Sequence, residues 1–183
     1  MNQHALGKKL ISDDEFNSHL QRFLIWTRQT MRGKKRMPPV LGLSFATQTH
    51  FDIELQILTR LPAEKRLEIM RRMGMDTMMR TPEKQLAACF IMAEAWAWQK
   101  ASPEDRLEVV SISGMTIDGR NNAAVIDFER TANGLLPGRA TTIPYTADAQ
   151  LADVLGKQTH NKLLQSFLHG YTLAWVVQQL PRN

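Results

Sequence analysis

The sequence has little cysteine and no long hydrophobic run, and each absence excludes a class of protein. Its 183 residues include one cysteine, Cys89, which lies within an apolar stretch. A lone cysteine cannot form an intrachain disulfide or a cysteine-rich zinc site, so a reducing compartment is favoured. No apolar run approaches the length of about 20 residues that a transmembrane helix needs, and no signal-peptide pattern follows Lys8 and Lys9. We therefore expect a soluble, cytoplasmic protein with no membrane association.

The common catalytic motifs are also missing. The sequence contains no glycine-rich phosphate loop, no GxSxG nucleophile elbow and no HExxH zinc motif. Cys89 has no visible histidine partner. These absences favour a protein that is not an enzyme, although enzymes without such motifs exist. No cofactor is expected.

The positive charge is concentrated in the first fifth of the chain. Residues 1–36 hold eight Lys or Arg against three acids, and this excess equals the formal net charge of +5. The length suits one domain, residues 1–183, with residues 1–11 flexible, and an apolar content of 43% is enough for a core. The charge asymmetry favours an acidic partner, but surplus basic residues also serve solubility.

Residues 86–98 form the most informative stretch, and large and small side chains alternate along it. The large side chains share one parity: Phe90, Met92, Glu94, Trp96 and Trp98. Alternation of this kind is typical of a strand. A helix is the alternative, because Thr81, Pro82 and Glu83 resemble a helix start and alanine is frequent. We favour the strand, because a helix here would have no clear polar face.

Two turn dipeptides organise the stretch that follows. Asp118-Gly119 and Asn133-Gly134 each predict a tight hairpin, and they separate β-branched segments at residues 107–116, 122–130 and 135–145. Pro137 must lie at an edge, at a bulge or outside the ladder. Residues 86–145 therefore predict an antiparallel meander of three or four strands.

The N-terminal part predicts a helix followed by a hairpin. Ser12 and Glu15 form a capping box, and Gly33 ends the helix. Residues 40–47 and 51–58 are the expected strands of the hairpin. In the second strand, one face should be buried and the other wet. The buried face would hold Phe51, Ile53, Leu55 and Ile57, and the wet face Asp52, Glu54 and Gln56.

Three further helices are expected. Pro62 opens a methionine-rich helix, which either fills the core or offers an adaptable binding surface. Thr146 begins a short helix that ends before Gly156. Residues 162–180 form a longer helix that is apolar on two faces in its second half. Such a helix is either buried on both sides or in contact with another subunit, and we favour a homodimer interface. The interface residues would be Leu173, Trp175, Val176 and Val177.

Two groups of residues are weak candidates for chemistry. His50, Asp52 and Glu54 alternate along a strand and could bind a metal, but they also fit the solvated face of an amphipathic strand. Glu94, among apolar neighbours, could be a catalytic acid or base. The alternatives are that this strand face is open to water, or that Glu94 forms a structural ion pair with an arginine of the meander. The candidate arginines are Arg106, Arg120 and Arg130.

A basic cluster follows the first helix and precedes Pro38-Pro39. Its members are Arg28, Arg32, Lys34, Lys35 and Arg36. These side chains could contact phosphates of a nucleic acid, or they could keep an exposed connector in water.

Together these patterns predict an α+β domain. The antiparallel sheet contains the meander of residues 86–145 and the N-terminal hairpin, and the N-terminal, Met-rich and C-terminal helices cover one face. The favoured function is a non-enzymatic binding or assembly module, whose partner is a second copy of the chain or another protein. Nucleic-acid binding through residues 28–36 is the first alternative. A small hydrolase or metal enzyme using Glu94 or the His50, Asp52 and Glu54 group is the second.

Overall fold

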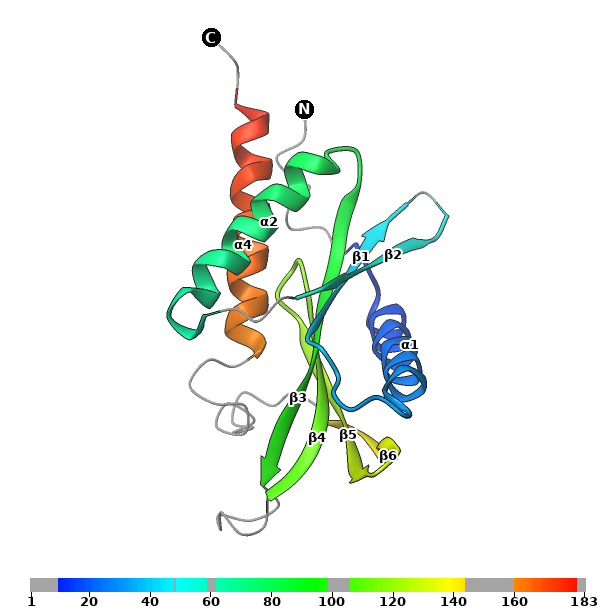
Figure 1. Cartoon of the computed structure of the whole chain (residues 1–183). Helices are drawn as coiled ribbons and strands as arrows, with labels where there is room; N and C mark the ends of the chain where they lie inside the picture. The colour runs from blue at the N-terminus through cyan, green and yellow to red at the C-terminus, as the bar shows by residue number, and fades with distance from the viewer. Residues whose placement is uncertain (1–9, 48, 59–61, 99–105, 144–159, 181–183) are drawn as a thin grey trace.

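The computed structural model describes residues 10–47, 49–58, 62–98, 106–143 and 160–180, which form an α+β fold (Figure 1). Its centre is a six-stranded antiparallel sheet with strand order β2-β1-β3-β4-β5-β6. The strands are β1 (Val40–Ala46), β2 (Phe51–Ile57), β3 (Gln85–Trp98), β4 (Arg106–Thr116), β5 (Asn121–Thr131) and β6 (Gly134–Ile143). The helices are α1 (Asp13–Met31), the 3-10 turn η1 (Ala63–Lys65), α2 (Arg66–Arg80) and α4 (His160–Gln179).

The expected meander is confirmed, and β3 is a strand rather than a helix. Both hairpin turns use a glycine in the left-handed region that other residues avoid, with φ of 90° at Gly119 and 109° at Gly134. Pro137 lies on the edge strand β6, next to a shift in the register between β5 and β6. The edge position is where a residue without an amide hydrogen is tolerated.

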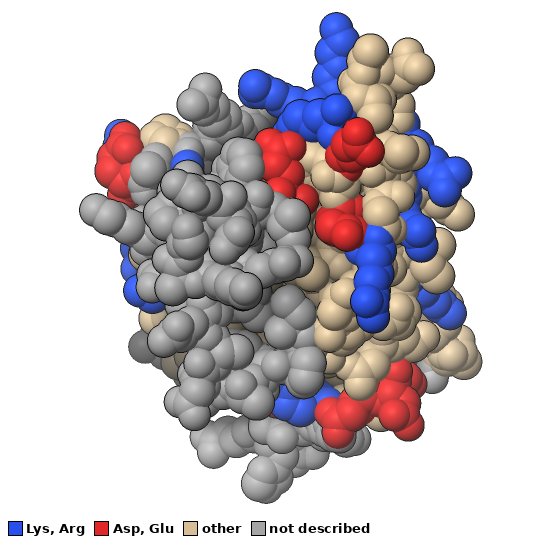
Figure 2. Space-filling view, turned by 90° about the horizontal axis from the view of Figure 1, so that it is seen from below, with Lys and Arg blue, Asp and Glu red and all other residues tan. Residues whose placement is uncertain are grey.

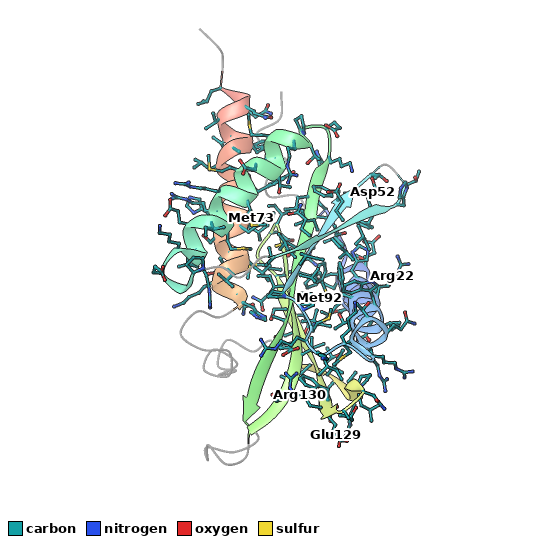
Figure 3. All side chains as sticks on the ribbon, in the orientation of Figure 1. Arg22, Asp52, Met73, Met92, Glu129 and Arg130 are labelled. Carbon is teal, nitrogen blue, oxygen red and sulfur yellow. The ribbon has the colours of Figure 1, made fainter. Side chains whose placement is uncertain are left out.

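The helices cover both faces of the sheet, which corrects the expectation that all three lie on one face. α1 packs on the face that presents Phe90 and Met92, whereas α2 and α4 pack on the face that presents Cys89 and Ile91. Met92 accordingly lies at the centre of the molecule (Figure 3). The side chains on both faces of β3 are apolar here. Such a strand needs another element packed against each of its faces.

The capping box predicted for α1 is confirmed. The Ser12 hydroxyl accepts a hydrogen bond from the Glu15 amide (3.1 Å), and the Glu15 carboxylate accepts one from the Ser12 amide (2.7 Å). The ring of Phe23 lies 4.4 Å from that of Phe90 and covers Gly42 of β1, where a side chain would collide with it. The glycine therefore lets the helix lie close to the sheet.

α2 and α4 touch through two glycines. A methyl group at Gly170 would overlap the carbonyl oxygen of Arg71, and one at Gly74 would overlap that of Phe167. Met70 and Met78 of α2 are buried, whereas Met79 is exposed. The methionine-rich helix therefore fills the core with part of its methionines, in agreement with the simpler of its two interpretations.

The predicted burial of β2 is wrong. Ile53, Leu55 and Ile57 are 39%, 43% and 73% exposed, and only Phe51 reaches the core, where its ring meets His19 edge-on. α1 lies over β3 to β6, so it leaves the edge strand uncovered on that face. An alternating pattern shows which residues share a face, but not whether another element covers it.

Some expectations lie outside the described residues. These are the short helix from Thr146, most of the N-terminal segment 1–11, and the side chains of Arg106, Trp96 and Trp98. Of that segment, Leu10 and Ile11 are described, and Ile11 is buried. No helix in the described ranges is long and apolar enough to cross a membrane.

Candidate functional site

Large apolar side chains are exposed on the outer face of α4. Leu173, Val176, Val177 and Leu180 are 41%, 40%, 57% and 60% exposed. These four residues are called the α4 surface below. The opposite face of the helix is buried through Leu164, Phe167 and Tyr171. The last turns of α4 project beyond the sheet, so no strand lies beside them (Figure 1).

The α4 surface includes three of the four predicted interface residues. Trp175, the fourth, is half-buried and packs against the core beneath the helix. Beside the surface lies an open, mainly apolar hollow between α4 and the turn from β4 to β5. Its lining consists of Met115, Gly119, Gln165, Leu168, His169, Thr172, Leu173 and Val176.

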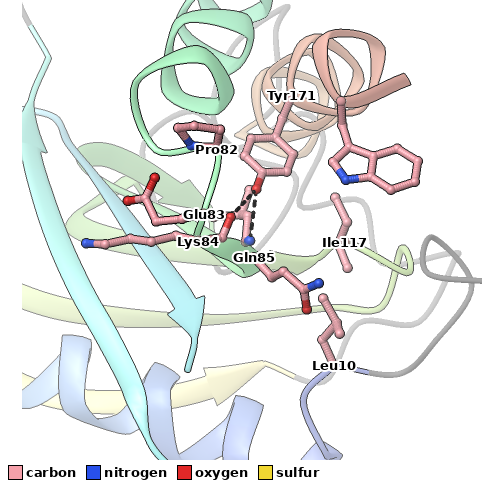
Figure 4. A pocket seen from close by; sticks show the side chains of 9 residues that line it. Leu10, Pro82, Glu83, Lys84, Gln85, Ile117 and Tyr171 are labelled. Atoms are coloured by element: carbon pink, nitrogen blue, oxygen red, sulfur yellow. Dashed lines mark hydrogen bonds between the residues drawn. The ribbon is translucent and has the colours of Figure 1, made fainter. Parts of the chain in front are cut away.

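A second, smaller pocket lies on the other side of α4 (Figure 4). It has a volume of about 120 Å³ and is mainly apolar. Its polar floor is satisfied internally, because the Tyr171 hydroxyl donates to the carbonyl of Lys84 (3.0 Å) and accepts from the amide of Leu86 (3.1 Å). Burial raises the pKa of Tyr171, so the hydroxyl stays neutral. This tyrosine anchors α4 to the start of β3 rather than offering a free reactive group.

Glu94 forms an ion pair with Arg130, one of the three candidate arginines of the meander. Its carboxylate accepts a hydrogen bond from Arg130 (2.7 Å) and another from the amide of Met37. Arg130 also donates to Glu108 (2.6 Å) and to the carbonyl of Lys35 (2.9 Å). Arg130 lies toward the end of β5, next to Glu129 (Figure 3). Both oxygens of Glu94 are thus engaged in fixing the connector between α1 and β1.

The possible metal ligands are occupied by other groups. His50 bonds to Asp52 (3.1 Å), and the Lys84 ammonium lies 2.9 Å from Glu54 and 3.8 Å from Asp52. A lysine at this position supplies the positive charge that a metal ion would otherwise bring. No group of three His, Cys, Asp or Glu side chains within the described ranges is arranged to hold a metal ion.

The basic cluster is exposed, and its backbone is ordered. Gly33 and Leu135 are joined by a hydrogen bond (3.3 Å), and the Leu135 amide donates to Lys34 (2.9 Å). The side chains of Arg28, Arg32, Lys34, Lys35 and Arg36 form no ion pair with an acid of the described segments. Seen from below, basic side chains spread over the right-hand side of the molecule with acidic ones between them (Figure 2). The charge is thus mixed rather than uniformly positive.

One buried polar cluster has no strong sequence signal. Nδ1 of His160, at the start of α4, lies 3.2 Å from the hydroxyl of Ser111 and 3.5 Å from that of Ser113. All three residues are buried, and burial lowers the pKa of His160 to about 4. The two hydroxyls provide hydrogen-bond partners for this buried neutral histidine, so it needs no substrate to supply them. Cys89 is likewise buried, and burial raises the pKa of its thiol, which disfavours the reactive thiolate form.

Similarity to known proteins gives no guide to the function of this chain. No family model matches this chain, and no curated protein or solved structure shows a significant similarity to it.

Proposed function

We propose that the protein is a non-enzymatic assembly module that forms a homodimer through the α4 surface. One observation carries this proposal. Four large apolar side chains stand exposed on a helix that has no Lys, Arg, Asp or Glu from position 163 to position 180. Solvated helix faces usually carry charge, whereas exposed apolar patches mark contact sites.

A second copy is the partner that suits this surface. A two-fold contact requires a patch that is complementary to itself, and an uncharged apolar helix face fulfils this without any charge having to be matched. The hollow beside Leu168 and Leu173 offers a place for a partner's apolar side chain. Charged residues are typically scarce in the buried centre of such interfaces.

Sedimentation at low micromolar concentration tests the proposal. The wild-type chain should have the mass of two chains, and Val177→Asp should reduce it to one, because the contact would bury an unpaired carboxylate. Leu136→Asp is the matched control, since Leu136 is similarly exposed but lies on β6. Circular dichroism should show both variants folded. A monomeric wild type, or a Val177→Asp variant that remains dimeric, contradicts the proposal.

Nucleic-acid binding is a second candidate, supported by the ordered backbone of the basic cluster. Hydrogen bonds to Leu135 and Arg130 hold residues 33–35 in place, so the five side chains project from a fixed surface. Fixed cations lose less entropy when they contact phosphates than mobile ones.

A further inference from the structure

The two edges of the sheet differ in how they are protected against the addition of another strand. The β6 edge carries Pro137 and a register shift, and the connector at residues 32–34 bonds to Leu135 along its start. Proline, bulges and covering segments are the usual means by which proteins block strand addition. The β6 edge therefore has three such means.

Among the described residues, the β2 edge has none of these three protections. β2 contains no proline, glycine or lysine, and its pairing with β1 continues without a register shift from Phe51 to Ile57. Its outer side pairs with no other strand of the described residues. A regular, unprotected edge of this kind is a template for another strand.

The side chains of β2 also favour a contact. Ile53, Leu55 and Ile57 lie exposed on the face toward α1, while Asp52 and Glu54 on the other face share an ion pair with the single ammonium of Lys84. Asp52 lies on β2 at the margin of the molecule (Figure 3). An incoming strand would therefore meet an apolar row on one face and an already paired polar row on the other.

We propose that β2 pairs antiparallel with β2 of a second copy, so that two sheets join into one across a two-fold axis. This contact is separate from the α4 surface, because β2 and α4 lie on different sides of the molecule (Figure 1). It does not require the proposed function to hold. If both contacts form, two kinds of two-fold interface join chains into a tetramer or an open filament.

Charge selects the register of this pairing. In an antiparallel pair, residues that lie opposite each other have their side chains on the same face of the sheet. The possible registers therefore differ by shifts of two residues, and each such shift moves the two-fold axis by one residue. With Leu55 on the axis, Leu55 faces the partner's Leu55, Ile53 faces the partner's Ile57, and Glu54 faces the partner's Gln56. With the axis at Glu54, two carboxylates would stand opposite each other, which is unfavourable. We therefore infer the register with Leu55 on the axis.

Single introduced thiols test both the contact and its register. Cys89 is buried, so it leaves the background free of reactive thiols. Under mild oxidation at high concentration, Leu55→Cys should form a covalent dimer, because directly opposite side chains have Cβ atoms about 5 Å apart. Ile53→Cys alone should not, since its two copies would be roughly 13 Å apart along the strands. A mixture of Ile53→Cys and Ile57→Cys should cross-link.

Two results would overturn the proposal. The first is a Leu55→Cys variant that cross-links no faster than Ile25→Cys, a control at an apolar position on α1 that is somewhat more exposed than Leu55. The second is cross-linking of Ile53→Cys with itself, which would reject this register. If the folded Ile25→Cys control formed disulfides at the rate of Leu55→Cys, the cross-link of Leu55→Cys would be explained by random collision alone.

Sedimentation at several concentrations separates this contact from the α4 contact. Leu55→Lys should stop association beyond the dimer and leave the α4 dimer intact, since a lysine on an edge strand opposes pairing. Val177→Asp should be monomeric at low micromolar concentration, where the α4 dimer is lost, and should pair through β2 only at higher concentration. If Leu55→Lys associates like the wild type at every concentration, the β2 contact is rejected whatever the α4 result.

Discussion

The Arg130 guanidinium lies 2.7 Å from the Glu94 carboxylate and joins β5 to β3 across β4. The same guanidinium bonds to Glu108 and to the carbonyl of Lys35, so one side chain ties the connector after α1 to the sheet. Glu94 completes this arrangement by accepting from the Met37 amide. The pair therefore acts as a clamp on residues 35–37.

The first prediction concerns this clamp. Arg130→Ala should lower the free energy of unfolding by about 1 to 2 kcal/mol, because it removes hydrogen bonds from a partly exposed network. Arg130→Lys should recover little, since an ammonium group cannot bond to three separated acceptors in the manner of a guanidinium. Urea denaturation measures both values. Unchanged stability in Arg130→Ala would show that the clamp is dispensable.

The second prediction concerns the role of Glu94 in the connector. Glu94→Gln should increase hydrogen exchange at the Met37 amide, because a neutral acceptor binds it less strongly than a carboxylate. The variant should stay folded. Exchange at Leu86, whose amide bonds to Tyr171 instead, is the internal control. If a folded Glu94→Gln loses an activity of the wild type, Glu94 is catalytic rather than structural.

The third prediction concerns the contact between α2 and α4. Gly170→Ala should destabilise the protein by about 1 to 3 kcal/mol, because its methyl group would overlap the carbonyl oxygen of Arg71. The sign of this stability change is informative, because helix propensity alone would make the alanine variant more stable by about 1 kcal/mol. Thr172→Ala, two residues away on the same helix, should change stability far less. A Gly170→Ala variant with raised thermal stability would refute the close packing.

The fourth prediction concerns acid stability. Burial lowers the pKa of His160 to about 4. The folded state therefore resists protonation while the unfolded chain takes up a proton near pH 6.5. Stability should be full above pH 6.5 and decline as the pH falls toward 4, with a loss of roughly 3 kcal/mol. His19, whose pKa is lowered by burial and by Arg22, acts in the same direction.

Urea denaturation between pH 7 and pH 4 measures this dependence. His160→Gln should flatten the curve, because glutamine can bond to the serine hydroxyls without titrating. His169→Gln, at an exposed position of the same helix, is the control. A wild type with equal stability at pH 7 and pH 4.5 would show that His160 is not buried in the neutral form.

The fifth prediction concerns the basic cluster. If Arg28, Arg32, Lys34, Lys35 and Arg36 all contact duplex DNA, affinity should fall with salt at a log-log slope near about −4.5. No base preference is expected, because the cluster presents no recognition helix and no aromatic platform. Replacement of Lys34, Lys35 and Arg36 by alanine should weaken binding and reduce the slope. Absence of binding at low salt, or binding that ignores the triple change, removes nucleic acid as a partner.

The local signals of the sequence were sufficient for the elements of the fold. Turn dipeptides such as Asp118-Gly119 demand a left-handed backbone, and the Ser12 and Glu15 capping box marks a helix start through bonds within four residues. Alternating side-chain size along β3 distinguished a strand from a helix. These signals depend on neighbours in the chain, so the sequence alone determines them.

The tertiary structure decided which faces are covered and which groups meet. The apolar row of β2 has the pattern of a buried face, yet it is exposed because α1 lies over other strands. Glu94 could have met any of three arginines; the register places it in line with Val110 and Ile126, and the side chain of Arg130, four residues beyond Ile126, reaches it. The burial of His160 against Ser111 likewise joins residues 49 positions apart. Periodicity along a chain assigns a side chain to a face, whereas its neighbours on that face depend on how distant elements pack.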